Sequence, residues 1–400
     1  MTDASLALYV HMPWCVRKCP YCDFNSHQLK SAQPDAAYIE TLIRDFRLEA
    51  PRVKDRRIDT VFFGGGTPSL FPPEHFARLL DALRQQIAFA SDVEITLEAN
   101  PGTIERGRFS GYKDAGINRV SLGAQTFDAR ALKALGRIHS AEDTQRAVEE
   151  LRAAKLDNFN LDLMYALPEQ TCDQAQNDVK KAIALKPAHI SYYQLTLEPG
   201  TVFAAHPPPL PDEDACAAML EESRALLSSA GFAQYEVSAY ARAGAQCRHN
   251  LNYWTFGDYL GIGAGAHGKL TFAAAGSVVR TTQLREPRRY LTAPDTALAQ
   301  RAVSPEDLPF EFMLNALRLT AGFEVETFVS RTGLAWEAVA PTVRAALDVG
   351  LLLRTAQGYR PSARGLRFLN DLLLGFLPET PKNSGASALS MATPEVAALR

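Results

Sequence analysis

The sequence predicts an α/β fold in which an open (β/α)6 partial barrel of parallel strands is followed by a winged-helix-like C-terminal domain. Two observations support this prediction. Six short β-rich runs alternate with helical patterns in the first half of the chain, which is the order of elements that builds a parallel sheet. Each run also ends in polar or glycine-rich residues, as expected where parallel strands direct their carboxyl ends toward one site.

The predicted barrel occupies residues 1–200, and its successive β-rich runs are separated by stretches long enough for the crossover that parallel strands need. The helices predicted between the strands include residues 36–49, 73–87 and 141–154. The six strands are predicted at residues 6–12, 58–63, 93–98, 119–123, 158–165 and 189–196.

The second half is predicted to hold a barrel-closing and linker segment at 201–300, a compact domain at 301–378 and a disordered tail at 379–400. The order of elements in the compact domain resembles a winged-helix module. Residues 303–378 contain seven arginines and no lysine against eight acidic residues, which is not the basic face that DNA requires. A lid or a partner-docking domain is therefore predicted. Its elements are expected at 310–319, 325–331 and 336–349 (helices), 351–362 (a β-hairpin) and 363–377 (a last helix).

The composition predicts a soluble, cytoplasmic protein. The 400 residues are 46% hydrophobic and 22% charged, and the net charge of −3 does not favour binding to nucleic acid. No apolar run reaches membrane-spanning length, and the first residues lack the features of a signal peptide. Six cysteines are too few and too clustered for a disulfide scaffold, so a reducing compartment is expected.

Three of the six cysteines, Cys15, Cys19 and Cys22, lie close together in the stretch HMPWCVRKCPYCDFNSH. A closed zinc site needs four nitrogen or sulfur ligands, and His11 or His27 could supply the fourth. A four-iron cluster held by only three thiolates would instead keep one iron open to another ligand. The more distant cysteines are interpreted as small buried apolar residues.

The strand ends bring further polar residues toward the cysteine loop. Glycines after the second strand would let the backbone approach a ligand with no Cβ in the way. Taken singly, Glu98 or Asp162 could cap a helix and Arg137 could form a surface ion pair. Six polar ends in register with one cysteine loop favour a shared site. The residues concerned are Gly65, Gly66, Thr67, Glu98, Gln125, Arg137, Asp162 and Thr196.

The Cys-x3-Cys-x2-Cys spacing resembles the signature of the radical S-adenosylmethionine (SAM) enzymes. This resemblance implies a [4Fe–4S] cluster on Cys15, Cys19 and Cys22, whose open iron binds the amino and carboxylate groups of SAM. It also implies a role in binding SAM for the residues at the strand ends, for the backbone near His267, and for Tyr9 and Tyr21, which could equally be barrel-core aromatics. No catalytic residue is assigned. The stretch GIGAGAHG at 261–268 is predicted as a tight loop over the barrel mouth rather than a dinucleotide-binding turn.

Longer motifs narrow the family. The stretches YVHMPWCVRKCPYCDF, FFGGGTPS, EANPGT, SLGAQTF, LGRIH and DLMYALPEQT resemble the branch that contains the oxygen-independent coproporphyrinogen III oxidases and the HemW haem chaperones. The oxidases typically carry a fourth cysteine two residues after the third, where this chain has Phe24, and a longer N-terminal extension. The sequence HNLNYW at 249–254 matches the HNxxYW motif of the chaperones. The chaperone is therefore the preferred hypothesis and the oxidase the alternative.

The motif implies that His249, Tyr253 and Trp254 contact haem. A neutral imidazole is a good axial ligand for haem iron, the two aromatics offer a flat apolar surface, and Arg248 could meet a propionate. A histidine beside aromatics is otherwise a common hydrogen-bonded structural residue. The expected partners are haem and a haem-acceptor protein, which could be associated with a membrane. The sequence leaves open the oligomeric state and whether SAM is cleaved, and hence whether the protein is an enzyme.

Overall fold

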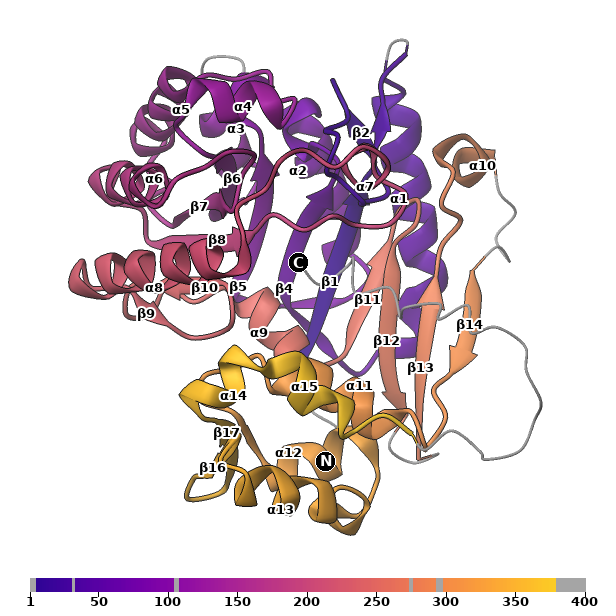
Figure 1. Cartoon of the computed structure of the whole chain (residues 1–400). Coiled ribbons are helices and arrows are strands. Elements are labelled where there is room, and N and C mark those ends of the chain that lie inside the picture. The colour runs from indigo at the N-terminus through magenta and orange to yellow at the C-terminus, as the bar shows by residue number, and fades with distance from the viewer. Residues whose placement is uncertain (1–4, 31–32, 104–107, 273–275, 293–297, 379–400) are drawn as a thin grey trace.

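The computed structural model describes residues 5–30, 33–103, 108–272, 276–292 and 298–378. Its largest sheet has twelve strands, and the six predicted parallel strands form the centre of that sheet in chain order (Figure 1). Pairing is parallel from the first of these strands to the last, which confirms the predicted partial barrel. The six strands are β1 (Ser5–Met12), β4 (Arg57–Gly65), β5 (Ala88–Ala99), β6 (Arg119–Gln125), β7 (Phe159–Tyr165) and β8 (His189–Gln194).

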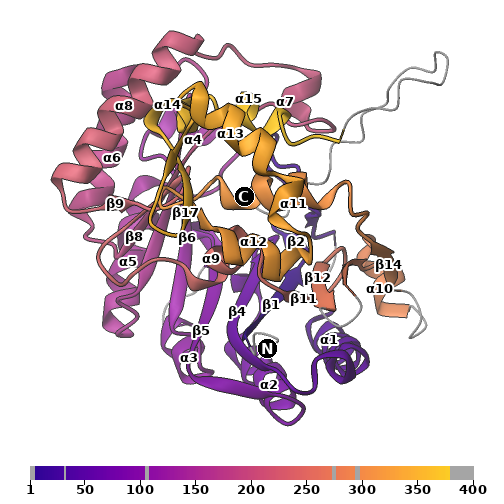
Figure 2. The same ribbon diagram turned by 90° about the horizontal axis from the view of Figure 1, so that it is seen from below.

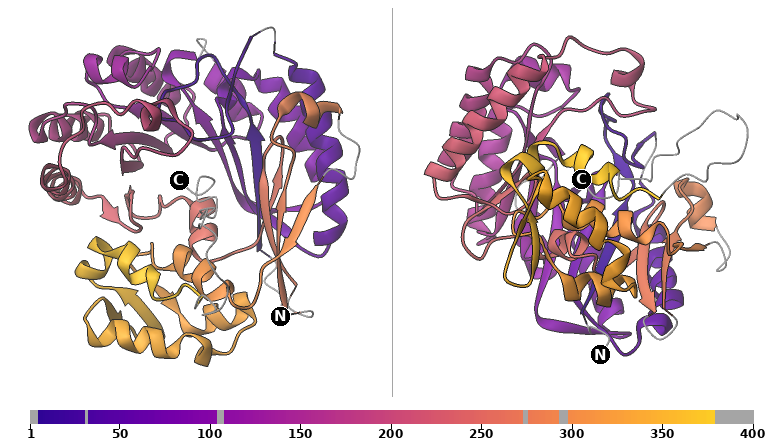
Figure 3. Two further views of the ribbon diagram at one scale, coloured as in Figure 1. Left: turned by 45° about the vertical axis from the view of Figure 1, so that its right-hand side comes forward. Right: turned by 60° about the horizontal axis from the view of Figure 1, so that its bottom comes forward.

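Helices cover the outer face of the curved sheet, as Figure 3 shows from the side. Alternate residues of β1 account for this arrangement, because Leu6, Leu8 and Val10 are fully buried in the same cluster as Leu42 and Phe46 of α1. The opposite face of the sheet lines the barrel interior. The helices are α1 (Asp35–Glu49), α2 (Pro73–Arg84), α3 (Arg108–Asp114), α4 (Ala129–Ala134), α5 (Ala141–Ala153), α6 (Cys172–Ala184) and α8 (Glu213–Ser229).

The segment 201–300, predicted as a closing segment and linker, extends the sheet at both ends. The short strands β9 (Ala233–Gln234) and β10 (Ala239–Ala241) add antiparallel pairs beside β8. At the other end β11 (Tyr259–Ile262) pairs in parallel with β1. The antiparallel strands β12 (His267–Phe272), β13 (Ser277–Thr282) and β14 (Ala299–Ala302) follow it, and α10 (Pro287–Thr292) lies between the last two.

This arrangement corrects the prediction of one tight loop at 261–268. Gly261 belongs to β11 and His267 begins β12, so only the residues between these two strands form a turn. A Cβ on Gly261 would lie 1.9 Å from the backbone oxygen of His267. The glycine is therefore needed for the close approach of two backbones within the protein.

The C-terminal domain packs below the barrel and lies in front of it in the view from below (Figure 2). It has its own core around Phe312, Phe328 and Val343. Phe256 of the barrel joins this core. The predicted helices and hairpin are present, but the predicted last helix is divided at Phe368 into two short helices. The elements are α11 (Leu308–Ala316), β15 (Phe323–Glu324), α12 (Val325–Thr332), α13 (Ala340–Asp348), β16 (Leu352–Arg354), β17 (Gly358–Pro361), α14 (Ala363–Arg367) and α15 (Leu369–Leu374).

The C-terminal domain lies at the opposite end of the barrel from the cysteine loop, which follows the carboxyl end of β1 (Figure 1). The predicted tail at 379–400 falls outside the described residues. Within the described ranges, no helix has the length and apolar character that crossing a membrane would require.

Candidate functional site

The cysteine loop is fixed to the ends of β1 and β4 by backbone hydrogen bonds. It leaves β1 through the short strand β2 (Trp14–Cys15) and returns through β3 (His27–Gln28), which pairs with β2 in parallel. The amides of Gly66 and Thr67 donate to the carbonyls of Met12 and Trp14 at 2.8 Å and 2.7 Å. The three thiols are therefore held at the carboxyl edge of the sheet, where the sequence predicted them.

Each of the three sulfurs lies beside a side chain that can donate a hydrogen bond to it. The Thr67 hydroxyl lies 3.5 Å from Cys15 Sγ, and an Arg137 guanidinium nitrogen lies 3.7 Å from Cys19 Sγ. The Ser26 hydroxyl lies 3.6 Å from Cys22 Sγ. All three cysteines are free and half-buried. Donors to the sulfurs are one means by which proteins tune iron–sulfur clusters.

Three thiols suit a four-iron cluster that keeps one iron open, whereas a closed zinc site takes a fourth nitrogen or sulfur ligand. Burial raises the pKa of the Cys15 thiol to about 11, so its thiolate form requires a cation beside it. Across the described ranges, no three His, Cys, Asp or Glu side chains converge on one metal-ion position. His11, one of the two alternative fourth zinc ligands, is engaged through both ring nitrogens with Tyr9 and with the carbonyl of Asn25. The other, His27, bonds through Nε2 to the side-chain oxygen of Asn25 at 3.2 Å.

The glycine turn after β4 packs tightly against the loop. Gly65 has a φ of +110°, and its amide donates to Glu98 Oε2 at 3.1 Å. A Cβ on this residue would lie 2.3 Å from the ring of His11, and one on Gly66 would lie 2.5 Å from the carbonyl oxygen of Trp14. Both glycines are thus required for the internal fit of the cysteine loop as well as for any approach of a ligand.

Replacing Gly65 with alanine should destabilise the protein by more than the roughly 1–3 kcal/mol of backbone strain alone. The added methyl group meets an imidazole that two hydrogen bonds hold in place. Denaturant unfolding measures the loss. Gly200→Ala is the matched control, because Gly200 also has a positive φ, of +82°, but faces open space. Equal losses in the two variants would show that the clash with His11 is relieved at no cost.

The acidic residues predicted to bind SAM lie close together in the barrel interior. Burial, with the neighbouring Asp162, raises the pKa of Glu98 to about 8. Asp162 accepts hydrogen bonds from Ser121 at 2.8 Å and from Asn160 at 2.7 Å. Neither side chain caps a helix in the described residues, and their binding to a nucleoside stays a prediction.

The raised pKa of Glu98 predicts a loss of stability as the pH rises. Below about pH 4.5 the carboxyl is protonated in both the folded and the unfolded chain. Between about pH 4.5 and pH 8 the unfolded chain releases a proton that the folded chain retains, so the free energy of unfolding falls across this window. Glu98→Gln should flatten that decline, measured by denaturant unfolding without SAM. The exposed Glu74 provides the control Glu74→Gln, which should leave the slope unchanged.

Arg137 has the geometry of a carboxylate-binding residue. One of its terminal nitrogens lies by Cys19 and the other donates to the carbonyl of Gly123 at 2.9 Å. Its Nε is buried and has no partner among the described residues. An unpartnered guanidinium nitrogen beside the cysteine loop fits the carboxylate of SAM.

The remaining predicted SAM residues occupy varied positions. Gln125 ends β6 with a φ of 63° and accepts from the hydroxyl of Tyr193 at 2.7 Å. Tyr9 stacks against Phe62, and Tyr21 packs on Phe203 beside the cysteine loop.

Two further predicted residues already have polar partners within the protein. Thr196 follows β8 and donates to Glu198 at 2.7 Å. His267 is held by Thr282 at 3.2 Å. The turn before His267 touches the cysteine loop, because Asn25 donates to the carbonyl of Ala264 at 2.9 Å.

The predicted haem residues do not join the cysteine loop. They lie on α9 (Arg248–Trp254), which packs between the barrel and the C-terminal domain (Figure 1). His249 contacts Thr60, five residues before Gly65 on β4, or about 17 Å away along a strand. The cluster loop and the HNLNYW motif are therefore at different levels of the barrel.

His249 is a buried, hydrogen-bonded residue in this structure. Its side chain is 1% exposed, with Nδ1 bonded to the Thr60 hydroxyl and Nε2 to the Tyr253 hydroxyl, each at 2.8 Å. Burial lowers its pKa to about 3, so the imidazole is neutral. Tyr253 is buried and Trp254 lies under the guanidinium of Arg318 at 4.3 Å. The expected flat apolar surface is thus used in packing, and binding of iron by His249 requires both of its hydrogen bonds to be exchanged.

The sequence did not identify the polar network that positions α9. The carboxylate of Glu94 accepts from the amides of Arg248 and His249, each at 3.1 Å. Arg119, only 2% exposed, lies beside Glu94 and carries an Nε without a partner among the described residues. The signal was present in the alternation of polar residues along β5 and β6, whose inward faces read Glu-x-Thr-x-Glu and Arg-x-Ser.

Comparisons with known proteins identify the family of the chain. Residues 9–182 match the model of the radical SAM superfamily, and residues 303–368 match the HemN C-terminal domain. The chain is 48% identical to the "Heme chaperone HemW" of Haemophilus influenzae, over 94% of this chain and 98% of that protein. It is 47% identical to the protein of the same name from Escherichia coli, with the same coverage.

More distant relatives extend the comparison. The mitochondrial "Radical S-adenosyl methionine domain-containing protein 1" of Mus musculus is 36% identical over 93% of this chain and 87% of its own length. Among solved structures, the coproporphyrinogen III oxidase HemN of Escherichia coli superposes with a TM-score of 0.77. The two share 22% identity over 93% of this chain and 90% of that chain, which supports a common fold.

Proposed function

The chain belongs to the HemW family within the radical SAM superfamily, and from this premise we propose that it is a haem chaperone. It binds haem and a SAM-ligated [4Fe–4S] cluster, and it passes the haem to an acceptor protein. The observation that carries this proposal is the identity of 47–48% with two proteins named as haem chaperones along 94% of the chain. The free thiols of the cysteine loop require a reducing compartment, which favours the cytoplasm.

The residues around the loop support the cofactor part of the proposal. Cys15, Cys19 and Cys22 would hold the cluster, and Arg137 would bind the carboxylate of SAM through its unpartnered Nε. Glu98 and Asp162 would accept from the nucleoside. A reduced cluster held here would be able to supply the electron that cleaves the sulfonium of SAM.

Coproporphyrinogen oxidation remains the alternative, because the chain shares the fold of HemN. That likeness is at 22% identity, well below the identity to the chaperones. Phe24 also stands where the oxidases typically place a fourth cysteine. The chaperone is therefore the function that the residues support better.

An anaerobic titration of the cluster-loaded protein with ferric haem tests the proposal. Stoichiometric binding with a shifted Soret band is expected, and His249→Ala should weaken it by about tenfold or change the band. The exposed His206 gives the control His206→Ala. Thermal unfolding of each variant separates a lost ligand from a lost fold. Absence of specific haem binding by the intact protein would overturn the proposal, and coproporphyrinogen turnover would then be assayed.

A further inference from the structure

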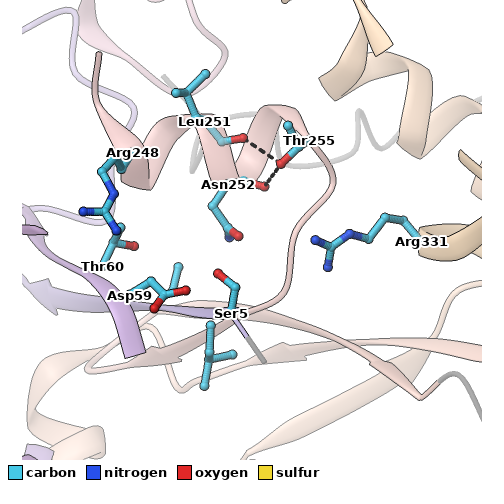
Figure 4. A pocket seen from close by; sticks show the side chains of 10 residues that line it. Ser5, Asp59, Thr60, Arg248, Leu251, Asn252, Thr255 and Arg331 are labelled. Atoms are coloured by element: carbon cyan, nitrogen blue, oxygen red, sulfur yellow. Dashed lines mark hydrogen bonds between the residues drawn. The ribbon is translucent and has the colours of Figure 1, made fainter. Parts of the chain in front are cut away.

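A pocket opens between the base of the barrel and the C-terminal domain (Figure 4). Its volume is about 270 Å³, slightly below the range of sites that enclose a whole small molecule, so it has room for one edge of a larger ligand. The starts of β1 and β4 form the floor, the outer side of α9 forms one wall, and α12 of the C-terminal domain forms the opposite wall. The polar residues that matter here are Ser5, Asp59, Thr60, Arg248, Asn252 and Arg331.

The helix α9 divides its residues between this pocket and the barrel interior. His249 and Tyr253, four residues apart, point inward and bond to each other. Arg248 and Asn252, also four residues apart, line the pocket. The HNLNYW motif therefore has a buried face and a pocket face.

Thr60 connects the two faces. It lines the pocket, and its hydroxyl bonds to Nδ1 of His249 at 2.8 Å. The imidazole thus lies directly behind the pocket wall, and Thr60 is one of the two partners that it must exchange to bind iron. A ligand that enters the pocket reaches this histidine over a short path.

We propose that this pocket receives the carboxylate edge of haem, with Arg248 and Arg331 pairing with the two propionates. This inference rests on the proposed function and specifies where haem is recognised. Both propionates of haem project from one edge of the porphyrin, and the two guanidinium groups reach the pocket from opposite walls (Figure 4). Arginine binds carboxylates through two parallel hydrogen bonds, which fixes orientation as well as charge.

The neighbouring charges leave Arg248 able to bind a propionate. Arg248 is paired with Asp92 at 3.0 Å, but the two side chains are 41% and 75% exposed, so this ion pair is weak and can exchange. Asp59 would repel a propionate, yet Arg57 is bonded to it at 2.9 Å and offsets its charge. Leu251, which is half-buried, also lines the pocket and offers apolar surface to the ring edge.

Two forms of the ligand test the proposal on the unaltered protein. Ferric haem and its dimethyl ester share the same macrocycle, but the ester carries no propionate charge. The ester should bind the cluster-loaded protein at least about tenfold more weakly, as expected for the loss of hydrogen bonds to charged groups. Equal affinities of the acid and the ester would overturn the proposal while leaving the haem-chaperone function intact.

Variants of the two arginines locate the effect. Arg248→Ala and Arg331→Ala should each weaken the binding of ferric haem by about tenfold. Each should also reduce the difference in affinity between ferric haem and its dimethyl ester. Arg360→Ala, an exposed arginine of the same domain outside the pocket, is the matched control and should change neither value. Unchanged binding by both pocket variants, or an equal loss in the control, would overturn the proposal. No binding by the parent protein would instead refute the proposed function.

Discussion

Replacing Cys19 with serine should leave the protein folded but without its [4Fe–4S] cluster. Cys19 is half-buried, and its carbonyl accepts a hydrogen bond from the amide of Cys22 at 3.2 Å. Other residues provide the backbone hydrogen bonds that fix the loop to β1 and β4. The substitution removes one of three thiolate ligands and supplies a hydroxyl, which is a poor ligand for the irons of such a cluster. Iron and acid-labile sulfide per chain, measured after anaerobic reconstitution, should fall to background.

Cys172 provides the matched control for this prediction. It is also a free, half-buried cysteine, but its sulfur faces the carbonyl of Ala215 between α6 and α8, away from the loop. Cys172→Ser should keep the full iron and sulfide content. A full cluster in Cys19→Ser, or an equal loss in Cys172→Ser, would contradict the assignment of the ligands.

Loss of the cluster should also abolish the binding of SAM. Arg137 contacts Cys19 and donates to the carbonyl of Gly123 on β6, so the proposed carboxylate site and the proposed cluster site share a side chain. Equilibrium dialysis of SAM should therefore show no specific binding by Cys19→Ser.

The six central strands could be predicted because their sequence signal is local. Parallel strands covered by helices read as short apolar runs, and their polar carboxyl ends mark the site edge. The strands of segment 201–300 gave no such signal. Several are only two to four residues long, and β11 pairs with β1 some 250 residues earlier in the chain. Only the folded barrel brings these partners together.

The candidate site was also predictable only where its sequence signal is local. The cysteine spacing is a local pattern, and it placed the three thiols correctly at the carboxyl edge of the sheet. For the HNLNYW motif, the spacing of His249 and Tyr253 indicates that they share a helix face, but not which way that face points. The answer depends on Thr60, which is 189 residues away in the chain. The sequence therefore pointed to a neutral imidazole but did not reveal that the protein already occupies both of its nitrogens.

Replacing Lys269 with methionine should cost about 3–5 kcal/mol of stability, a large part of what a typical domain has. Lys269 is 1% exposed and pairs at 2.8 Å with Asp258, which is also buried. The ammonium group donates to the carbonyl of Phe256 at 2.8 Å and lies 4.2 Å from that ring, so it joins the barrel to the C-terminal core. Denaturant unfolding of the variant should show the loss, whereas the exposed Lys54→Met should show none.

The cost arises mainly from the carboxylate that is left behind. Burial disfavours the ionised form of Asp258, but Lys269, Thr271 and Arg56 together outweigh that effect and hold the pKa of the carboxyl below its usual range. Without Lys269, the carboxylate keeps its burial and loses its nearest cation. Adding Asp258→Asn to Lys269→Met should therefore restore part of the lost stability, and the double-mutant cycle gives the coupling free energy. If the two substitutions simply add, the ion pair contributes little and the lysine acts through its packing against Phe256.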